Sequence, residues 1–234
     1  MFIFISLYLL PPLHLFLHVT ATEDYLLPYS PTDLILLNCG ASSNLSSPDG
    51  RSWDGDSQSK FAASNPPEAS SVFNSSTQQV PYMTARIFHS KFTYTFPLLP
   101  GPKFVRLYFY PAAYSNLDIS KSYFSLSANN YKLLNNFSAS LTVSAITPPV
   151  DYFTKEFIIT VWDNQKFELT FSPSPSSFAF INGIEIVSMP DSFYARGNDN
   201  PPTYVGFDSF FYLDNTTALE TVYRLNVGGK ISTA

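Results

Sequence analysis

Large apolar residues alternate with small polar ones in several short stretches of this chain. In residues 92–96 (FTYTF) aromatic side chains alternate with threonine, and this period of two predicts a β-strand. Residues 104–110 alternate in the same way and have one apolar and one mixed face, so we expect the apolar face to pack in a core. The apolar face carries Val105, Leu107 and Phe109, and the mixed face carries Phe104, Arg106, Tyr108 and Tyr110.

Further strands and turns continue this pattern along the chain. Strands are predicted at residues 123–128, 157–162, 167–171 and 178–187. Asn182-Gly183 divides the last of these into two apolar halves, which is typical of a two-residue hairpin turn. Helical periodicity is almost absent. We therefore expect an all-β fold, an antiparallel β-sandwich or jelly roll.

Two segments read as long polar loops, residues 40–67 and residues 191–203. Loops at the rim of a sandwich are free for recognition, because the sheets beneath them supply the core.

A short motif occurs near both ends of the chain. An apolar or aromatic approach leads into Leu37-Asn38-Cys39-Gly40, and again into Leu225-Asn226-Val227-Gly228. The spacing is that of a domain rather than of a solenoid repeat. Chance is one explanation, since these residue types are common. The other is that a module begins near Leu34 and that a second copy begins near Thr221.

The repeat and the N-terminal pattern together predict four segments. Residues 1–21 resemble a secretory signal peptide, although no Lys or Arg precedes the apolar run. A membrane anchor is the alternative, but Pro11-Pro12 interrupts the run. Residues 22–33 form a lead, residues 34–212 a domain, and residues 213–234 a linker with the truncated first strand of a second domain. We expect residues 221–229 to be loosely held or to rest against the first domain.

Composition narrows the class of partner. Charged residues make up only 13% of the chain and its net charge is −5, which argues against nucleic acid and anionic lipid as partners. Aromatic residues make up 17%, which suits pleated surfaces. The single cysteine, Cys39, is expected to be a small buried apolar residue, with a reactive thiol or an intermolecular disulfide as alternatives.

Sequons for N-glycosylation are present in a chain that we expect to enter the secretory pathway. Each fits Asn-x-Ser/Thr without proline, so each is a candidate for a surface glycan. The four are at Asn44, Asn74, Asn136 and Asn215.

No catalytic residue, metal site or cofactor is predicted. Downstream of the signal peptide the only histidine is His89, and no nucleophile or zinc motif accompanies it. Asp54 and Asp56 flank Gly55 and are weighed as a carboxylate pair for glycoside hydrolysis or as calcium ligands, but turn formation is the simpler interpretation.

The ordered set of motifs resembles the ectodomain of the malectin-like receptor kinases of plants, the FERONIA-type family. The resemblance rests on six motifs in the family's order: ILLNCG from Ile35, GRSW from Gly50, PYMTARIF from Pro81, FVRLYFYP from Phe104, FINGIE from Phe180 and YRLNVGG from Tyr223. Members of that family carry two malectin-like domains, a membrane span and a Ser/Thr kinase. This resemblance implies that residues 34–212 are the first malectin-like domain. The kinase lies outside this sequence, so kinase activity is not carried over.

The same resemblance implies a non-catalytic extracellular recognition domain. Its expected partners are cell-wall carbohydrate or a secreted cysteine-rich peptide, together with a co-receptor anchored by glycosylphosphatidylinositol. Stacking of sugars on aromatic rings makes the outward face of the strand at 104–110 and the following loop the best candidate surface. The alternative is that these tyrosines pack beneath the loops. The candidates are Arg106, Tyr108, Tyr110, Tyr114 and Asn116.

Two other functions remain open at this point. One is a secreted soluble decoy of such a receptor, and the other is a jelly-roll carbohydrate-active enzyme. In each case we expect the protein in the secretory pathway, and then outside the cell or associated with the plasma membrane.

Overall fold

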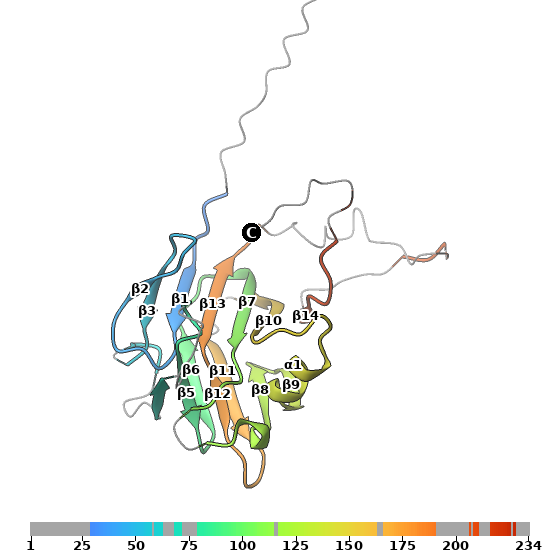
Figure 1. The fold of residues 1–234 in the computed structure, drawn as a ribbon. Coiled ribbons are helices and arrows are strands. Elements are labelled where there is room, and N and C mark those ends of the chain that lie inside the picture. The colour runs from blue at the N-terminus through green and yellow to red at the C-terminus, as the bar shows by residue number, and fades with distance from the viewer. Residues whose placement is uncertain are drawn as a thin grey trace, which may run out of the picture.

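The computed structural model describes residues 29–57, 59–62, 68–71, 79–114, 117–162, 166–190, 206, 208–210, 216–225 and 227. Short strands dominate this part of the chain (Figure 1). The elements are β1 (Leu34–Asn38), β2 (Leu45–Ser46), β3 (Ser52–Gly55), β4 (Ala69–Ser71), β5 (Thr84–Phe88), β6 (Phe92–Phe96), β7 (Gly101–Phe109), η1 (Ile119–Lys121), β8 (Phe124–Ala128), β9 (Tyr131–Phe137), α1 (Ala139–Ala145), β10 (Phe153–Val161), β11 (Phe167–Pro173), β12 (Ala179–Ile181), β13 (Gly183–Ser188) and β14 (Leu219–Glu220).

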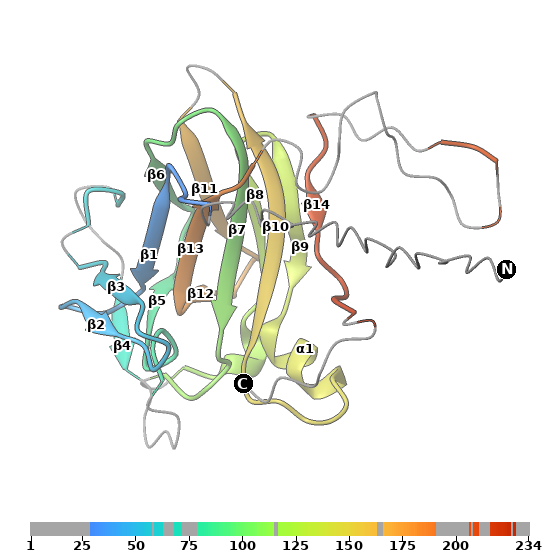
Figure 2. The same cartoon turned by 90° about the horizontal axis from the view of Figure 1, so that it is seen from above.

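The strands form a β-sandwich, as the sequence predicts. One sheet has the order β14-β10-β7-β13-β1-β3-β2, and the other layer consists of the sheets β6-β11-β8-β9 and β12-β5-β4. Figure 2 shows β1, β13, β7 and β10 side by side, with β6, β11 and β8 behind them. Apart from the parallel pair β1 and β3, neighbouring strands run antiparallel.

The alternation along β7 divides its side chains between two environments. Val105, Leu107 and Phe109 are completely buried in the main core between the layers, as their spacing predicts. The opposite face carries Phe104, Arg106 and Tyr108, and Tyr108 belongs to a second, smaller apolar cluster with Trp53 and Tyr82. The outer face of the large sheet is therefore partly covered rather than fully open to solvent.

The predicted hairpin at Asn182-Gly183 is wrong. β12 pairs with β5 and β13 pairs with β7, so the chain crosses from one layer to the other at this point. Such a hairpin turn needs left-handed backbone, and neither residue has a positive φ. Glycine is required at 183 because a Cβ there would lie 2.5 Å from the Pro81 Cγ.

The region read as a long loop at residues 40–67 contains strands β2 and β3, which corrects that prediction. Trp53 on β3 is completely buried, and its indole N–H donates to Ser47 Oγ at 3.2 Å. Packing against the outer face of the sheet thus orders a segment whose composition is typical of a loop. The other predicted loop, residues 191–203, lies outside the described residues.

Cys39 and Asp56 both lie inside the protein. Cys39 has no exposed surface, which confirms its prediction as a buried residue. Asp56 is also buried and does more than form a turn: its carboxylate accepts hydrogen bonds from Arg86 Nε at 3.0 Å, Tyr94 Oη at 2.9 Å and the Gly40 N–H at 2.7 Å. This shared carboxylate ties β5 and β6 to the segment after β3.

The C-terminal described segment adds to the large sheet. Leu219 and Glu220 pair with Ile158 and Phe157 of β10, and β14 lies beside the other strands in Figure 2. After β14 the apolar side chains are exposed, 84% for Tyr223 and 83% for Leu225.

The predicted division into residues 34–212 and 213–234 stays a prediction. Residues 1–28, which include the predicted signal peptide, lie outside the described residues. No helix among those described is long and apolar enough to cross a membrane.

Candidate functional site

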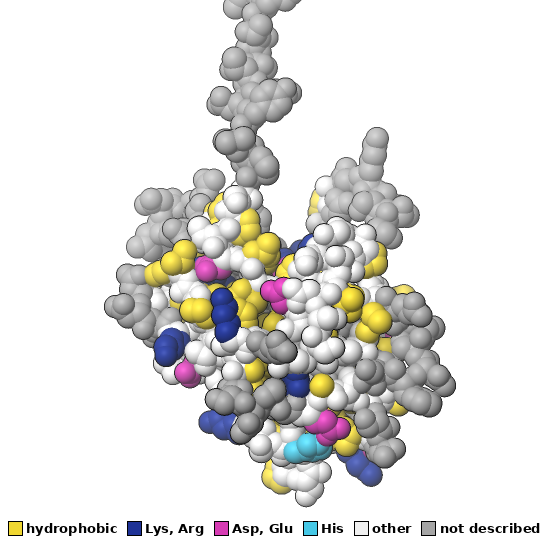
Figure 3. All heavy atoms as spheres, turned by 90° about the vertical axis from the view of Figure 1, so that its left-hand side faces the viewer, with side chains coloured by type: hydrophobic (Ala, Val, Ile, Leu, Met, Phe, Trp, Pro, Cys, Tyr) yellow, Lys and Arg dark blue, Asp and Glu magenta, His cyan; other side chains and the backbone are white. Residues whose placement is uncertain are grey.

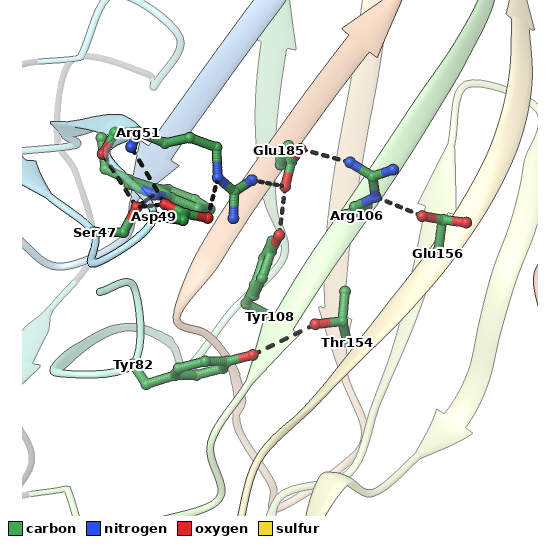
Figure 4. A network of polar contacts seen from close by, with 10 residues as sticks. Ser47, Asp49, Arg51, Tyr82, Arg106, Tyr108, Thr154, Glu156 and Glu185 are labelled. Atoms are coloured by element: carbon green, nitrogen blue, oxygen red, sulfur yellow. Dashed lines mark hydrogen bonds and ion pairs between the residues drawn. The ribbon is translucent and has the colours of Figure 1, made fainter. Parts of the chain in front are cut away.

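A row of alternating charges crosses the outer face of the large sheet (Figure 4). Arg51 Nη1 lies 3.0 Å from Glu185 Oε2, and Arg106 Nη1 lies 2.6 Å from Glu185 Oε1. On its other side Arg106 Nε lies 2.5 Å from Glu156 Oε2. We call Arg51, Glu185, Arg106 and Glu156 the charge row.

The strand register creates this row. Glu185 of β13 and Glu156 of β10 both lie directly opposite Arg106 of β7. Residues directly opposite on neighbouring strands point to the same side of the sheet at contact distance. Two carboxylates therefore flank one guanidinium, although the three residues are far apart in the sequence.

The carboxylates of the charge row are buried and the arginines are partly exposed. Glu185 is 3% exposed and Glu156 is 8% exposed, whereas the Arg106 side chain keeps 24% of its surface. Burial opposes ionisation of Glu156, but hydrogen bonds from Arg106, Thr221 and Arg224 outweigh it and hold the pKa of Glu156 below its usual value. Burial also opposes the charge on Arg106, yet its two carboxylate partners raise the pKa of Arg106. Arg106 and Glu156 therefore form a charged pair at neutral pH.

Aromatic side chains border the charge row on one side. The Tyr108 hydroxyl donates to Glu185, and the Tyr108 ring lies edge-on to Trp53 with a centroid distance of 5.2 Å. Tyr82 packs against Tyr152 at 4.2 Å and against Tyr110 at 6.5 Å. Burial raises the pKa of Tyr82 to about 12, so its hydroxyl stays neutral. Tyr110 and Tyr152 remain partly exposed at the end of this aromatic border.

A cleft of about 380 Å³ opens at the other end of the charge row. Arg106 and Glu156 form its floor, and the segment after β14 forms one wall. Arg224 of that wall pairs with Glu156. Tyr223 lines the same cleft and is 84% exposed, so the cleft combines an aromatic side chain with a charged floor.

The structure brings some of the predicted site residues together and separates others. Arg106 and Tyr108 line the cleft, and Tyr110 is half-buried at the end of the aromatic border. The outward orientation expected for Tyr114 is wrong, because this side chain is completely buried in the main core. Its hydroxyl donates to the Tyr110 carbonyl at 2.5 Å and accepts from Asn182 Nδ2 at 2.7 Å. Asn116 lies outside the described residues.

Sequence reasoning missed the residues that complete the site. Glu185 and Arg51 occur in two of the quoted motifs, but neither was assigned a role. The signal for Glu185 is its place between Ile184 and Ile186, where a carboxylate shares the face opposite the core. Only the pairing of β13 with β7 shows which cation it meets.

Two of the four sequons lie in the described residues. Asn44 is exposed, and its Nδ2 donates to Asp54 Oδ1 at 2.8 Å. Asn136 is exposed on β9, the edge strand of its sheet. Asn74 and Asn215 lie outside the described residues.

The arrangement suits binding better than hydrolysis. A glycosidase needs a carboxylic acid that stays protonated near neutral pH, whereas the pKa of Glu156 is lowered and Glu185 is held between two arginines. His89 is exposed and lies 3.5 Å from Glu68 Oε2, far along the chain from the charge row. Among the residues that the structure describes, no three His, Cys, Asp or Glu side chains are grouped so as to hold a metal ion.

Comparison with known sequences finds relatives of this chain. The sequence model of the malectin-like domain matches residues 37–234. A putative receptor-like protein kinase of Arabidopsis thaliana is 52% identical over 209 residues, covering 86% of this chain and 24% of the relative. The receptor-like protein kinase FERONIA of the same plant is 48% identical over 209 residues, with 86% of this chain and 23% of FERONIA covered. The chain thus spans about a quarter of the length of these relatives.

Solved structures agree with the sequence matches. The crystal structure of the plant receptor-like kinase FER matches with a TM-score of 0.72 and 45% identity, covering 84% of this chain and 49% of that one. A crystal structure of the plant peptide RALF23 in complex with FER and LLG2 matches with a TM-score of 0.73 and 45% identity. That match covers 86% of this chain and 50% of the other.

Proposed function

Since this chain belongs to the malectin-like domain family and is similar to FERONIA-type ectodomains, we propose that it is a non-catalytic extracellular recognition domain that binds a secreted peptide. The observation that carries the proposal is the charge row beside an open cleft. Side chains that ion pairs already hold in place cost little further ordering when a ligand binds. Charged ligand groups can then be recognised by the exposed edges of Arg51 and Arg106.

The peptide class is supported by the relatives rather than by the fold alone. The FER chain that resembles this one is seen in a complex with the peptide RALF23 and with LLG2. We propose a ligand of that class for this domain, and with it a co-receptor anchored by glycosylphosphatidylinositol. The proposed place of action is the outer face of the plasma membrane, where an anchored co-receptor lies and which a secreted peptide can reach.

Calorimetry with the purified chain and RALF23, with and without LLG2, tests this function. We expect heat of binding that falls when Arg224→Gln removes the exposed cation above Glu156, whereas Lys132→Gln on the far edge of the other sheet leaves it unchanged. Arg224 is a suitable target because its side chain is 60% exposed and Glu156 keeps Arg106 as a cationic partner when Arg224 is replaced. Absence of heat under both conditions would refute peptide recognition by this chain.

Cell-wall carbohydrate is a second candidate ligand. The supporting observation is the aromatic border, where Tyr110 and Tyr152 are partly exposed beside Tyr82. Aromatic rings at a surface next to polar groups can stack on sugar rings. Pectin fragments should then bind with an affinity that Tyr152→Ala lowers and Arg224→Gln does not. No binding of pectin fragments would dismiss this candidate and leave peptide recognition untouched.

We also propose that Asn44 and Asn136 carry glycans, since both sequons are exposed. Protein secreted from plant cells should lose mass on enzymatic deglycosylation. Asn44→Gln and Asn136→Gln should each remove one glycan, and an unchanged mass would exclude that position.

A further inference from the structure

In the part of the chain that the structure describes, the N-terminal half of β1 has a neighbouring strand on one side only and so forms a free edge of the large sheet. β13 pairs with β1 along its whole length, from Leu34 to Asn38. On the opposite side β3 pairs only with Leu37 and Asn38. Among the strands that the structure describes, none lies beside residues 34–36 on that side.

The backbone of Leu34 is directed toward this free edge. The Asp33 carbonyl accepts from the Ser188 N–H, and the Cys39 N–H donates to the Asn182 carbonyl, so the odd-numbered residues of this segment bond to the β13 side. Alternate residues of an antiparallel pair turn both backbone groups away from that partner. Asn38 follows this rule, because its carbonyl accepts from the Asp56 N–H on the β3 side. Leu34 therefore presents an N–H and a carbonyl where no described strand pairs with them.

A cleft of about 520 Å³ lies beside this edge. Its apolar lining includes Ile35, Leu37, Phe61 and Pro97. Leu34 also borders it and is 58% exposed. Figure 3 shows the side of the molecule on which β1, β2 and β3 lie, where hydrophobic side chains gather around acidic and basic ones. A free strand edge and an apolar cleft are the two parts of a site that binds an extended peptide.

The charges at the rim indicate which peptide fits. Lys60 lines the cleft with its Nζ 5.3 Å from the centroid of the Phe61 ring, and it forms no ion pair with any described residue. Asp33 also lines the cleft, but its carboxylate already pairs with Lys103, whose Nζ lies 2.9 Å from Asp33 Oδ2. An acidic ligand residue next to an apolar one would complement Lys60 while the apolar side chain enters the cleft.

We propose that this β1 edge is a second docking site, at which an extended segment of a secreted protein adds as a strand beside residues 34–36. One apolar side chain of that segment enters the cleft between Ile35, Phe61 and Pro97, and an acidic neighbour pairs with Lys60. The inference rests on the proposed function in that it assigns peptide ligands to this domain, but it uses a surface separate from the charge row.

A display library of linear hexapeptides, selected on the purified chain, provides the probe. Recovered peptides should share an acidic residue beside an apolar one and should be synthesised for calorimetry. Leu34→Pro should weaken their binding about tenfold, because proline lacks the N–H that the docked strand needs. Proline is tolerated at the first residue of a strand, and this N–H is not used by β13. Leu34→Ala keeps the N–H, so its affinity for the recovered peptides should stay within about threefold of that of the unchanged chain.

Calorimetry with the same peptides tests the role of the Lys60 charge. Lys60→Glu should weaken binding of the recovered peptides about tenfold, and Lys132→Glu, on the edge of the other sheet, should not. Hydrogen exchange gives a readout that needs no variant: the Leu34 amide should exchange quickly in the free chain and slowly with peptide bound.

Several results would overturn the proposal. They are recovery of no peptide, binding that Leu34→Pro leaves intact, an unprotected Leu34 amide in the complex, and a homodimer in sedimentation that Leu34→Pro dissociates. Failure of the proposed function is distinguishable, because RALF23 binding should respond to Arg224→Gln and the hexapeptides should not.

Discussion

Arg106 of β7 lies directly opposite Glu185 of β13, and Arg106 Nη1 is 2.6 Å from Glu185 Oε1. The same guanidinium reaches Glu156 of β10 through its Nε. Arg106 on β7 thus pairs with two buried carboxylates, one on each neighbouring strand, which makes it the central residue of the charge row.

Replacing Arg106 should destabilise the fold. Arg106→Met leaves Glu156 and Glu185 with fewer cationic partners, and an uncompensated buried charge is costly, so we expect a loss of about 3 kcal/mol in the free energy of unfolding. Urea denaturation measures this loss. Lys132→Met, at an exposed position on β9, should change stability by less than about 0.5 kcal/mol. A loss for Arg106→Met as small as this control would show that the charge row contributes little.

Acid should weaken the fold through Glu156. The folded-state pKa of this carboxyl lies below its usual value of 4.5, so the unfolded chain takes up the proton first as the pH falls. The stability that Glu156 contributes is therefore present above about pH 5 and is lost as the pH falls through its folded-state pKa. Urea midpoints between pH 7 and pH 3 should fall less steeply for Glu156→Gln than for the unchanged chain. Asp151→Asn, at an exposed carboxylate, should leave the slope unaltered.

The buried ion pair of Asp56 and Arg86 should contribute more to the stability of the fold than the exposed carboxylate of Asp54 does. Asp56→Asn removes the charge that faces Arg86, whose side chain is 4% exposed, and should cost about 3 kcal/mol. Asp54→Asn is the matched control, since Asp54 is exposed and its Oδ1 contact with Asn44 can be kept. Equal stability of the two variants, measured by thermal or urea unfolding, would contradict this account.

Cys39 should be inert in the folded chain. Burial, reinforced by the nearby Asp56 carboxylate, raises the pKa of its thiol well above the usual value, and no part of the residue is exposed. Iodoacetamide should label Cys39 only after unfolding, as followed by mass spectrometry. Labelling of the folded chain at the rate of a free cysteine would mean that this region opens readily.

The local pattern of apolar and polar residues was sufficient to predict features that depend on a single strand, such as its position and its buried face. The alternation in residues 104–110 predicts which face of β7 is buried, because successive side chains of a strand point to opposite faces whatever its partners are. The strand at residues 92–96 is confirmed as β6 for the same reason. The ordered motifs also identify the family, since each is read directly from the chain.

Local pattern failed where a residue's role depends on segments distant in the sequence. Asn182-Gly183 has the composition of a hairpin turn, yet Gly183 is there because Pro81 leaves no room for a Cβ. Tyr114 follows a strand with an outward polar face but turns into the core, where Asn182 and the Tyr110 carbonyl satisfy its hydroxyl. Trp53 lies in a polar stretch and is buried by the outer face of the sheet.

The amino-acid sequence alone determined the all-β class, the burial of Cys39 and the membership of the malectin-like family. Only the tertiary structure decided that Arg51, Glu185, Arg106 and Glu156 form one row. It also decided that residues 34–36 of β1 border an apolar cleft on a side where no described strand pairs with them. The physical reason is strand order. The sheet brings β13, β7 and β10 together from distant parts of the chain, and neither hydrophobic period nor composition records which strands become neighbours.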